Sequence, residues 1–213
     1  MRFLRKINKG LVLTIIVIVA LVIYLVNIEA KRSAEKPYID QAINEYVELV
    51  DKFAVMPEEY QKIYTKIKNE DEENKINENF ENAIQEQLTR FEDELKTKMV
   101  DNKTAREQQK NILDMIISSS NNPTQNVVIK YDREIKKIKK YEFDEDQVTV
   151  TFDSNIEIET KYLENGKART KKNTQKAEGE SVTLKFENGI WKIVYADLRY
   201  QSNMATTEMF GIF

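Results

Sequence analysis

The chain has 213 residues, with 33 basic and 36 acidic side chains, no cysteine and no histidine. Disulfide frameworks, thiolate nucleophiles, histidine-ligated zinc and imidazole-dependent catalytic triads are therefore excluded. The formal net charge is −3. Nonspecific nucleic-acid binding relies on a basic surface, so no nucleic acid is expected as a partner.

Residues 11–28 form an apolar run without a charge, and the preceding leader, residues 1–10, carries four basic residues and no acid. A helix of 18 residues rises about 27 Å, close to the thickness of the membrane hydrocarbon. The run is predicted to be one transmembrane helix in contact with membrane lipid, and its anchor residues include Leu11, Ile15, Ile18, Leu21 and Leu25. The basic leader predicts a cytoplasmic N-terminus and an extracytoplasmic C-terminal domain in the cell membrane, with a single pass.

A cleaved signal peptide is the main alternative for this N-terminal segment. Its apolar region is usually about 7 to 15 residues long, shorter than the run seen here. A cut near Ala30 would place Ile28 where a small residue is needed. Because the chain has no cysteine, lipid attachment after cleavage is also excluded. A retained anchor is therefore predicted.

Residues 29–36 are expected to form a linker, and residues 37–120 a helical segment in which Pro37 suits a first turn. A short helix is expected from Tyr60 to Ile67, and residues 69–74 are either a solvated connector or the charged start of the next helix. From Ile76 to Met99 apolar residues recur with a mean step of about 3.8, above the ~3.5 of a coiled-coil seam. This helix is predicted to lie across a curved partner, and a last helix is expected from Thr104.

Residues 121–200 switch to a period of two, which predicts an antiparallel meander, with residues 201–213 as a C-terminal tail. The long strand of residues 147–163 is expected to bend at residues 153–155, and Asn165-Gly166 and Asn188-Gly189 predict hairpin turns. The last strand is apolar on both parities and is expected to lie inside the sheet. Helices followed by a meander predict an α+β fold, with the helical segment packed on a curved sheet.

The long bent strand QVTVTFDSNIEIETKYL (147–163), the Asn165-Gly166 hairpin and the closing ESVTLKFENGIWKIVYADL (180–198) resemble the NTF2-like superfamily of cone-shaped α+β domains. Members with one transmembrane helix and an extracytoplasmic domain include the VirB8-like subunits of type IV secretion systems for conjugation. The resemblance implies no catalytic residues, no cofactors, and partners among other membrane or secretion-complex proteins. The richness in Lys, Asn, Ile and Glu is typical of a Gram-positive source.

One stretch of basic residues is the strongest surface candidate. Lys167, Arg169, Lys171, Lys172 and Lys176 lie in a segment with no acid before Glu178. Neighbouring positions lack large apolar groups, so this strand is expected to project as an exposed arm. It could engage anionic wall polymer, lipid headgroups or an acidic protein surface. The alternative is that the lysines only protect an edge strand from pairing.

Three further sets of residues have both a functional and a plainer structural explanation. The tail, with Phe210 and Phe213, is expected either to fray or to dock on a neighbouring subunit in a homo-oligomer. An aromatic set could line a cone-shaped cavity but is more typical of a core: Tyr38, Tyr46, Tyr60, Tyr64 and Trp191. Acid pairs could suggest calcium or acid–base chemistry, but a turn and a solvated strand face explain them more simply: Asp144 with Asp146, and Glu157 with Glu159.

These observations predict a non-enzymatic, membrane-anchored scaffold or interaction subunit of a conjugation or secretion complex. The second hypothesis is a ligand-binding or protective surface protein, such as an immunity or envelope-stress factor, which a deep apolar cavity beneath the sheet would favour. A glycan-acting enzyme with two carboxylates is the weakest hypothesis.

Overall fold

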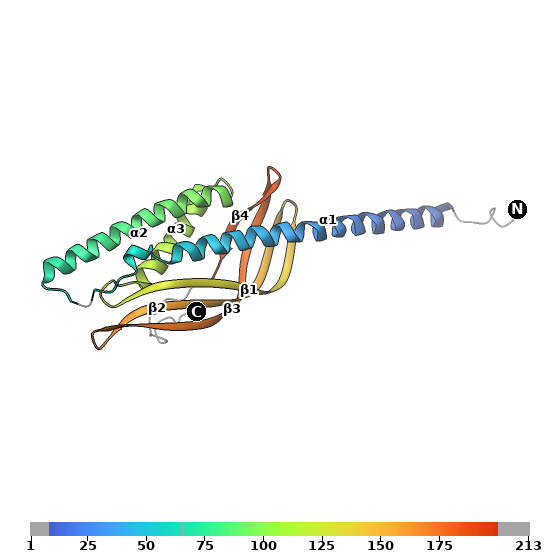
Figure 1. Cartoon of the computed structure of the whole chain (residues 1–213). Coiled ribbons are helices and arrows are strands. Elements are labelled where there is room, and N and C mark those ends of the chain that lie inside the picture. The colour runs from blue at the N-terminus through green and yellow to red at the C-terminus, as the bar shows by residue number, and fades with distance from the viewer. Residues whose placement is uncertain (1–8, 65, 200–213) are drawn as a thin grey trace, which may run out of the picture. The chain divides into compact units, whose positions relative to one another are not determined.

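The structure is a computed structural model that describes residues 9–64 and 66–199. Internal contacts divide the chain into two units, residues 1–40 and residues 41–213. The helical elements are α1 (Lys9–Ala54), a short 3-10 turn η2 (Glu58–Tyr60), α2 (Glu70–Lys98) and α3 (Lys103–Ser120). The strands are β1 (Asn126–Asp144), β2 (Gln147–Glu164), β3 (Lys167–Glu187) and β4 (Ile190–Asp197) (Figure 1). The predicted α+β class is confirmed.

Helix α1 runs without a break through residues 29–36, where a linker was expected, and past Pro37. Proline lacks a backbone N–H and removes one intrahelical hydrogen bond. The flanking residues are mostly Glu, Ala, Lys and Arg, which favour helix and carry the backbone through. The expectation that a helix begins at Pro37 was therefore wrong.

The N-terminal unit exposes an apolar helix surface. From Val12 to Val26 the large apolar side chains are 40% to 64% exposed, and the most apolar window of 18 residues has a mean hydropathy of 2.7. Four of the predicted anchor residues, Ile15, Ile18, Leu21 and Leu25, are each more than half exposed. The fifth, Leu11, lies in α1, but its side chain is outside the described set. The N-terminal helix is thus long and apolar enough to span a membrane.

The charged run at residues 69–74 is the start of α2. The Asn69 side chain accepts a hydrogen bond from the backbone N–H of Glu72 at 2.9 Å, and acidic residues in the first turn complement the helix dipole. The prediction of a short helix from Tyr60 to Ile67 is wrong, since among the described residues of this segment only Tyr60, the end of η2, is helical. The backbone of this segment bonds to a distant part of the chain instead: the Tyr64 N–H donates to the carbonyl of Pro123 at 3.0 Å.

The predicted apolar stripe of α2 faces the core of the second unit. Phe80, Ile84, Leu88, Phe91 and Leu95 are buried. The ring of Phe91 lies 5.4 Å from that of Phe53, near the end of α1. Gln87 Nε2 donates to the carbonyls of Phe53 and Val55 at 2.5 and 3.0 Å. These contacts join α2 to the end of α1, which otherwise has unsatisfied carbonyls.

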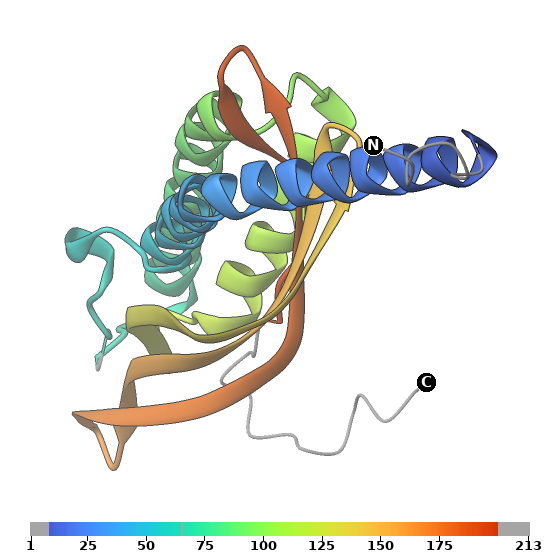
Figure 2. The ribbon, with the colours of Figure 1, turned by 90° about the vertical axis from the view of Figure 1, so that its right-hand side faces the viewer.

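The four strands form an antiparallel meander in the order β1-β2-β3-β4. The helices of the second unit lie on one side of this sheet, and the sheet curves around α3 (Figure 2). The pairing register shifts between Phe152 and Ser154, so the predicted bend is confirmed. Both Asn-Gly turns have positive φ at their two central residues, as the hairpin prediction requires.

The prediction for the last strand was wrong. A meander places β4 at the edge of the sheet, where it pairs with residues 181–187 of β3. On its other side Ile193 makes one isolated parallel bridge to Met99, and its carbonyl accepts from the Val100 N–H at 2.9 Å. Ile193 is buried, but Ile190 and Tyr195 on the other face are 52% and 43% exposed. Apolar residues at both odd and even positions of a strand therefore do not require that both faces be covered. Here the face with Ile190 and Tyr195 is open to solvent.

Candidate interaction surfaces

The predicted basic arm is the first half of β3. Residues 164–174 are all exposed, and the register from Glu164↔Lys167 to Ser154↔Ala177 pairs this half with β2 without a shift. The basic set lies together on this one strand: Lys167, Arg169, Lys171, Lys172 and Lys176. The expectation of an exposed projecting arm is met.

The arm is an open edge of the sheet. Strand β4 pairs with β3 only from Ser181 to Glu187, so among the described strands only β2 pairs with residues 167–177. This position fits the edge-protection explanation, since lysines discourage an unwanted strand from adding there. It equally leaves backbone donors and acceptors available to a suitable partner.

Ion pairs within the sheet neutralise part of the arm. Arg169 Nε lies 2.6 Å from a carboxylate oxygen of Glu164, and Lys172 Nζ lies 2.6 Å from Glu157. The second carboxylate oxygen of Glu157 accepts from Lys130 on β1 at 2.8 Å. The hydrogen bonds from both lysines lower the pKa of Glu157. This acid is therefore part of a solvated ladder across three strands.

The other acid pair also has a plain role. Asp144 ends β1, and Glu145 in the turn before β2 has a φ of 50°. Asp146 lies 3.5 Å from Lys185 Nζ. In the part of the chain that the structure describes, no group of three or more acidic side chains is placed to hold a metal ion.

The predicted tail residues Phe210 and Phe213 lie outside the described residues. The aromatic candidates do not gather around one cavity. Tyr46 is fully buried and donates from its hydroxyl to Gln109 at 2.7 Å, whereas Tyr38 is 65% exposed. The Trp191 ring lies 5.3 Å from the ring of Phe186 on β3. The core explanation therefore holds for Tyr46.

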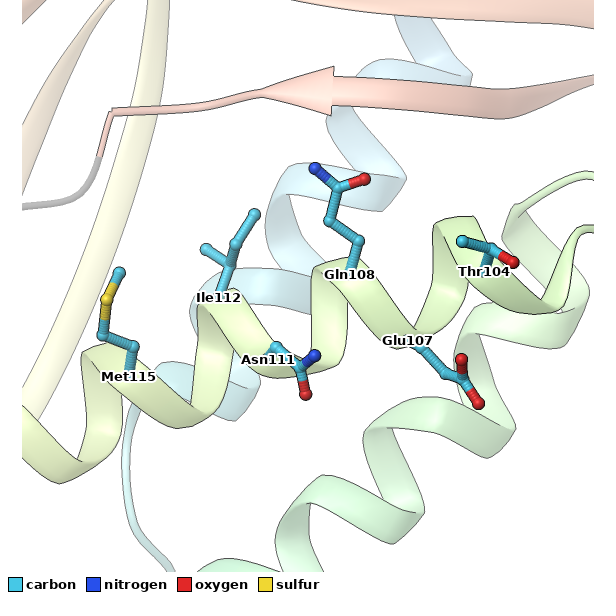
Figure 3. Close-up of a pocket in the computed structure, with 6 residues that line it drawn as sticks. All are labelled: Thr104, Glu107, Gln108, Asn111, Ile112 and Met115. Atoms are coloured by element: carbon cyan, nitrogen blue, oxygen red, sulfur yellow. The ribbon is translucent and has the colours of Figure 1, made fainter.

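Two surface hollows lie on the helical side of the second unit. The first, about 520 Å³ and open to solvent, is lined by Thr104, Glu107, Gln108, Asn111, Ile112 and Met115 (Figure 3). All six side chains come from α3, so it is a strip of helix surface. The second, about 390 Å³, includes Tyr60 and Tyr64 in its lining. Neither contains a residue of the sheet, so neither is the deep cavity beneath the sheet that the ligand-binding hypothesis requires.

A buried ionic cluster at the bend of the sheet was not found from the sequence. Arg133 of β1 and Glu180 of β3 have fully buried side chains, with 3.5 Å between Nη1 and Oε1. Glu180 also accepts from the hydroxyl of Ser154 and from the backbone N–H of Arg199. Arg133 Nη2 donates to the Arg199 carbonyl at 2.7 Å. The cluster thus joins three strands to the segment that follows β4.

Asp51 connects helix α1 to the same cluster. Its Oδ2 accepts from the backbone N–H of Arg133 at 2.5 Å, and its Oδ1 is buried without a hydrogen bond. Burial raises the pKa of Asp51 to about 7, and the nearby Asp132 and Glu180 act in the same direction, although Arg133 opposes them. Burial also raises the pKa of Tyr131 to about 12. The arrangement is a structural lock, because its side chains contact one another and the backbone of Arg133 and Arg199.

We expect Asp51→Asn to remove much of the dependence of stability on pH. In the folded domain Asp51 keeps its proton up to about pH 7, whereas in the unfolded chain it loses it near pH 3.9. Stability from this group therefore falls as pH rises through this window, by at most on the order of 4 kcal/mol. Urea unfolding at pH 5 and pH 8, followed by Trp191 fluorescence, measures the difference. If the free energy of unfolding changes between pH 5 and pH 8 by the same amount in the variant and in the native protein, this assignment is contradicted.

Such a cluster has no sequence signal beyond single polar residues inside apolar patterns. Arg133 stands in a charged stretch of β1, and Glu180 follows Gly179 at the bend. Only the pairing of β1, β2 and β3 brings them together.

Comparison with family models, with curated proteins and with solved structures finds no match for this chain. The NTF2-like and VirB8-like resemblance of residues 147–163 and 180–198 therefore stays a prediction.

Proposed function

We propose that this protein is a single-pass, membrane-anchored interaction subunit whose folded domain acts outside the cytoplasmic membrane. The observation that carries the proposal is the exposed apolar surface of α1 from Val12 to Val26. Water would make so large an apolar surface costly, whereas lipid would cover it. The basic leader supplies the argument for the cytoplasmic side of the N-terminus.

The role in protein contacts is supported by the chemistry that the second unit offers. Arg133 and Glu180 are bound to each other and to neighbouring groups within the buried cluster. The exposed features of this unit include a basic strand edge and a strip of α3. Anchoring then acts by position. Restriction to the membrane raises the effective concentration of the folded domain near partners in the same membrane. A conjugation or secretion complex of the VirB8-like kind is the setting we favour.

Crosslinking in intact cells tests this proposal. We expect the 25.1 kDa chain to appear in larger, reproducible adducts with other membrane proteins or with a second copy of itself. The same reaction on a variant without residues 1–28 is the control, because it lacks the anchor and should lose those adducts. A native protein that gives only the monomer band would contradict an interaction role.

A further inference from the structure

We propose that the outer edge of residues 167–178 of β3 binds an acidic, extended segment of a partner protein as a fifth strand of the sheet. The inference names the partner chemistry for the interaction role proposed above, and it rests on that role. It combines an available backbone edge with a charge pattern.

The backbone edge is available over most of the arm. Strand β2 pairs with one side of residues 167–177, and β4 begins to pair with the other side only at Ser181. On that other side no strand of the described residues pairs with the arm. Alternate N–H and C=O groups along such an edge can hydrogen-bond to one more strand, and main-chain bonds supply affinity in this mode of recognition.

The charge of this edge selects an acidic partner. The arm carries five basic side chains and no acid from Lys167 to Ala177. Arg169 and Lys172 have ion-pair partners on the hairpin. Lys167, Lys171 and Lys176 are exposed and make no ion pair within 4.0 Å with the described residues. The positive charge therefore exceeds what the sheet neutralises.

The basic residues lie on both faces of the strand, which favours a strand-like partner over a flat anionic surface. Directly paired residues share a face. Lys167 lies opposite Glu164 and Lys171 opposite Thr160, on the face that carries the buried side chains of β2. Lys176 lies opposite Asn155 on the other face. A lipid surface would meet only one of these faces. An added strand presents side chains to both, because its residues alternate.

The same charges discourage the wrong partner. Two copies of this chain that paired through their arms would bring five basic residues against five, and repulsion opposes that arrangement. Edge protection and selective binding are thus compatible, because one pattern rejects a basic strand and accepts an acidic one.

The test uses the purified full-length protein in a nonionic detergent and a fluorescent peptide of three Glu-Glu-Thr-Thr repeats, which places glutamate on both faces of a strand. Fluorescence anisotropy measures its affinity. A second peptide has the same side chains but is N-methylated at consecutive residues, so it keeps the charge and cannot add as a strand. We expect N-methylation to weaken binding by at least about tenfold, equivalent to about 1.4 kcal/mol.

Charge-reversal variants separate the arm from the rest of the surface. Lys167→Glu with Lys171→Glu is expected to weaken binding of the unmodified peptide by at least about tenfold. The matched control, Lys62→Glu with Lys75→Glu, changes the net charge equally at exposed positions elsewhere and should have little effect. Circular dichroism checks that all variants remain folded.

Equal affinity for the two peptides would overturn the inference and would indicate a site for anionic polymer. Absence of binding by the unmodified peptide, or an equal loss in the control variant, would also overturn it. If crosslinking in cells still yields protein adducts in those cases, the proposed function stands and only the strand-addition edge is rejected.

Discussion

Replacing Arg133 with leucine is expected to destabilise the folded domain by about 3–5 kcal/mol, the usual cost of removing one partner from a buried ion pair. The variant leaves Glu180 and Asp51 buried without the only basic side chain of the cluster that the structure describes. It also removes the donor to the Arg199 carbonyl. The loss of stability should be smaller at pH 5 than at pH 8, because at pH 5 Asp51 holds a proton and carries no charge.

Urea unfolding of the full-length protein in detergent measures this effect, with the single tryptophan, Trp191, as the fluorescent reporter. Arg90→Leu is the matched control, because Arg90 is exposed on α2. Its substitution should change the free energy of unfolding by no more than about 0.5 kcal/mol. A loss below 1 kcal/mol for Arg133→Leu, within about the error of such extrapolations, would show that the cluster does not hold the sheet and helix α1 together.

Placing two arginines in the apolar run is expected to prevent stable membrane insertion. Ile18→Arg with Leu21→Arg puts charge at the centre of residues 11–28, where each arginine costs about 2.5–3.5 kcal/mol. The native protein should stay in the membrane pellet after alkaline carbonate extraction, and the variant should move to the supernatant.

The apolar exchange Ile18→Leu with Leu21→Ile is the control for this experiment, since it keeps the hydropathy and should remain in the pellet. If the arginine variant also remains in the pellet, the apolar surface of α1 does not provide the anchor.

Local sequence patterns determined much of the fold. The stripe from Phe80 to Leu95 depends on neighbours three and four residues apart, and it predicts the buried face of α2 correctly. The two Asn-Gly pairs predict their turns because few other residues adopt positive φ at both positions. The bend near Ser154 follows from a strand too long to stay regular.

Tertiary context decided the features that the sequence did not reveal. Pro37 is a plausible helix start, yet α1 passes through it. The apolar pattern of β4 suggests a central strand, but the order of the meander makes it an edge. The ionic cluster joins Asp51 to Arg133 and Glu180 across more than 80 residues of sequence, and no local pattern predicts that contact.

For the basic arm too, one part could be predicted from the sequence and another part depends on the fold. The basic arm is visible in the sequence, because charge composition and a hairpin signal are both local. That its outer edge has no described strand beside it depends on how far β4 extends along β3. That limit is set by the length of β4 and cannot be inferred from the basic residues themselves.

Labelling of single cysteines in intact cells tests the central claim most directly. The native chain has no cysteine, so Lys75→Cys in the folded domain and Asn8→Cys in the leader each provide one reactive site. A membrane-impermeant maleimide should label the first in whole cells and the second only after lysis. Labelling of the leader in whole cells with protection of the domain would contradict an extracytoplasmic, membrane-anchored interaction subunit.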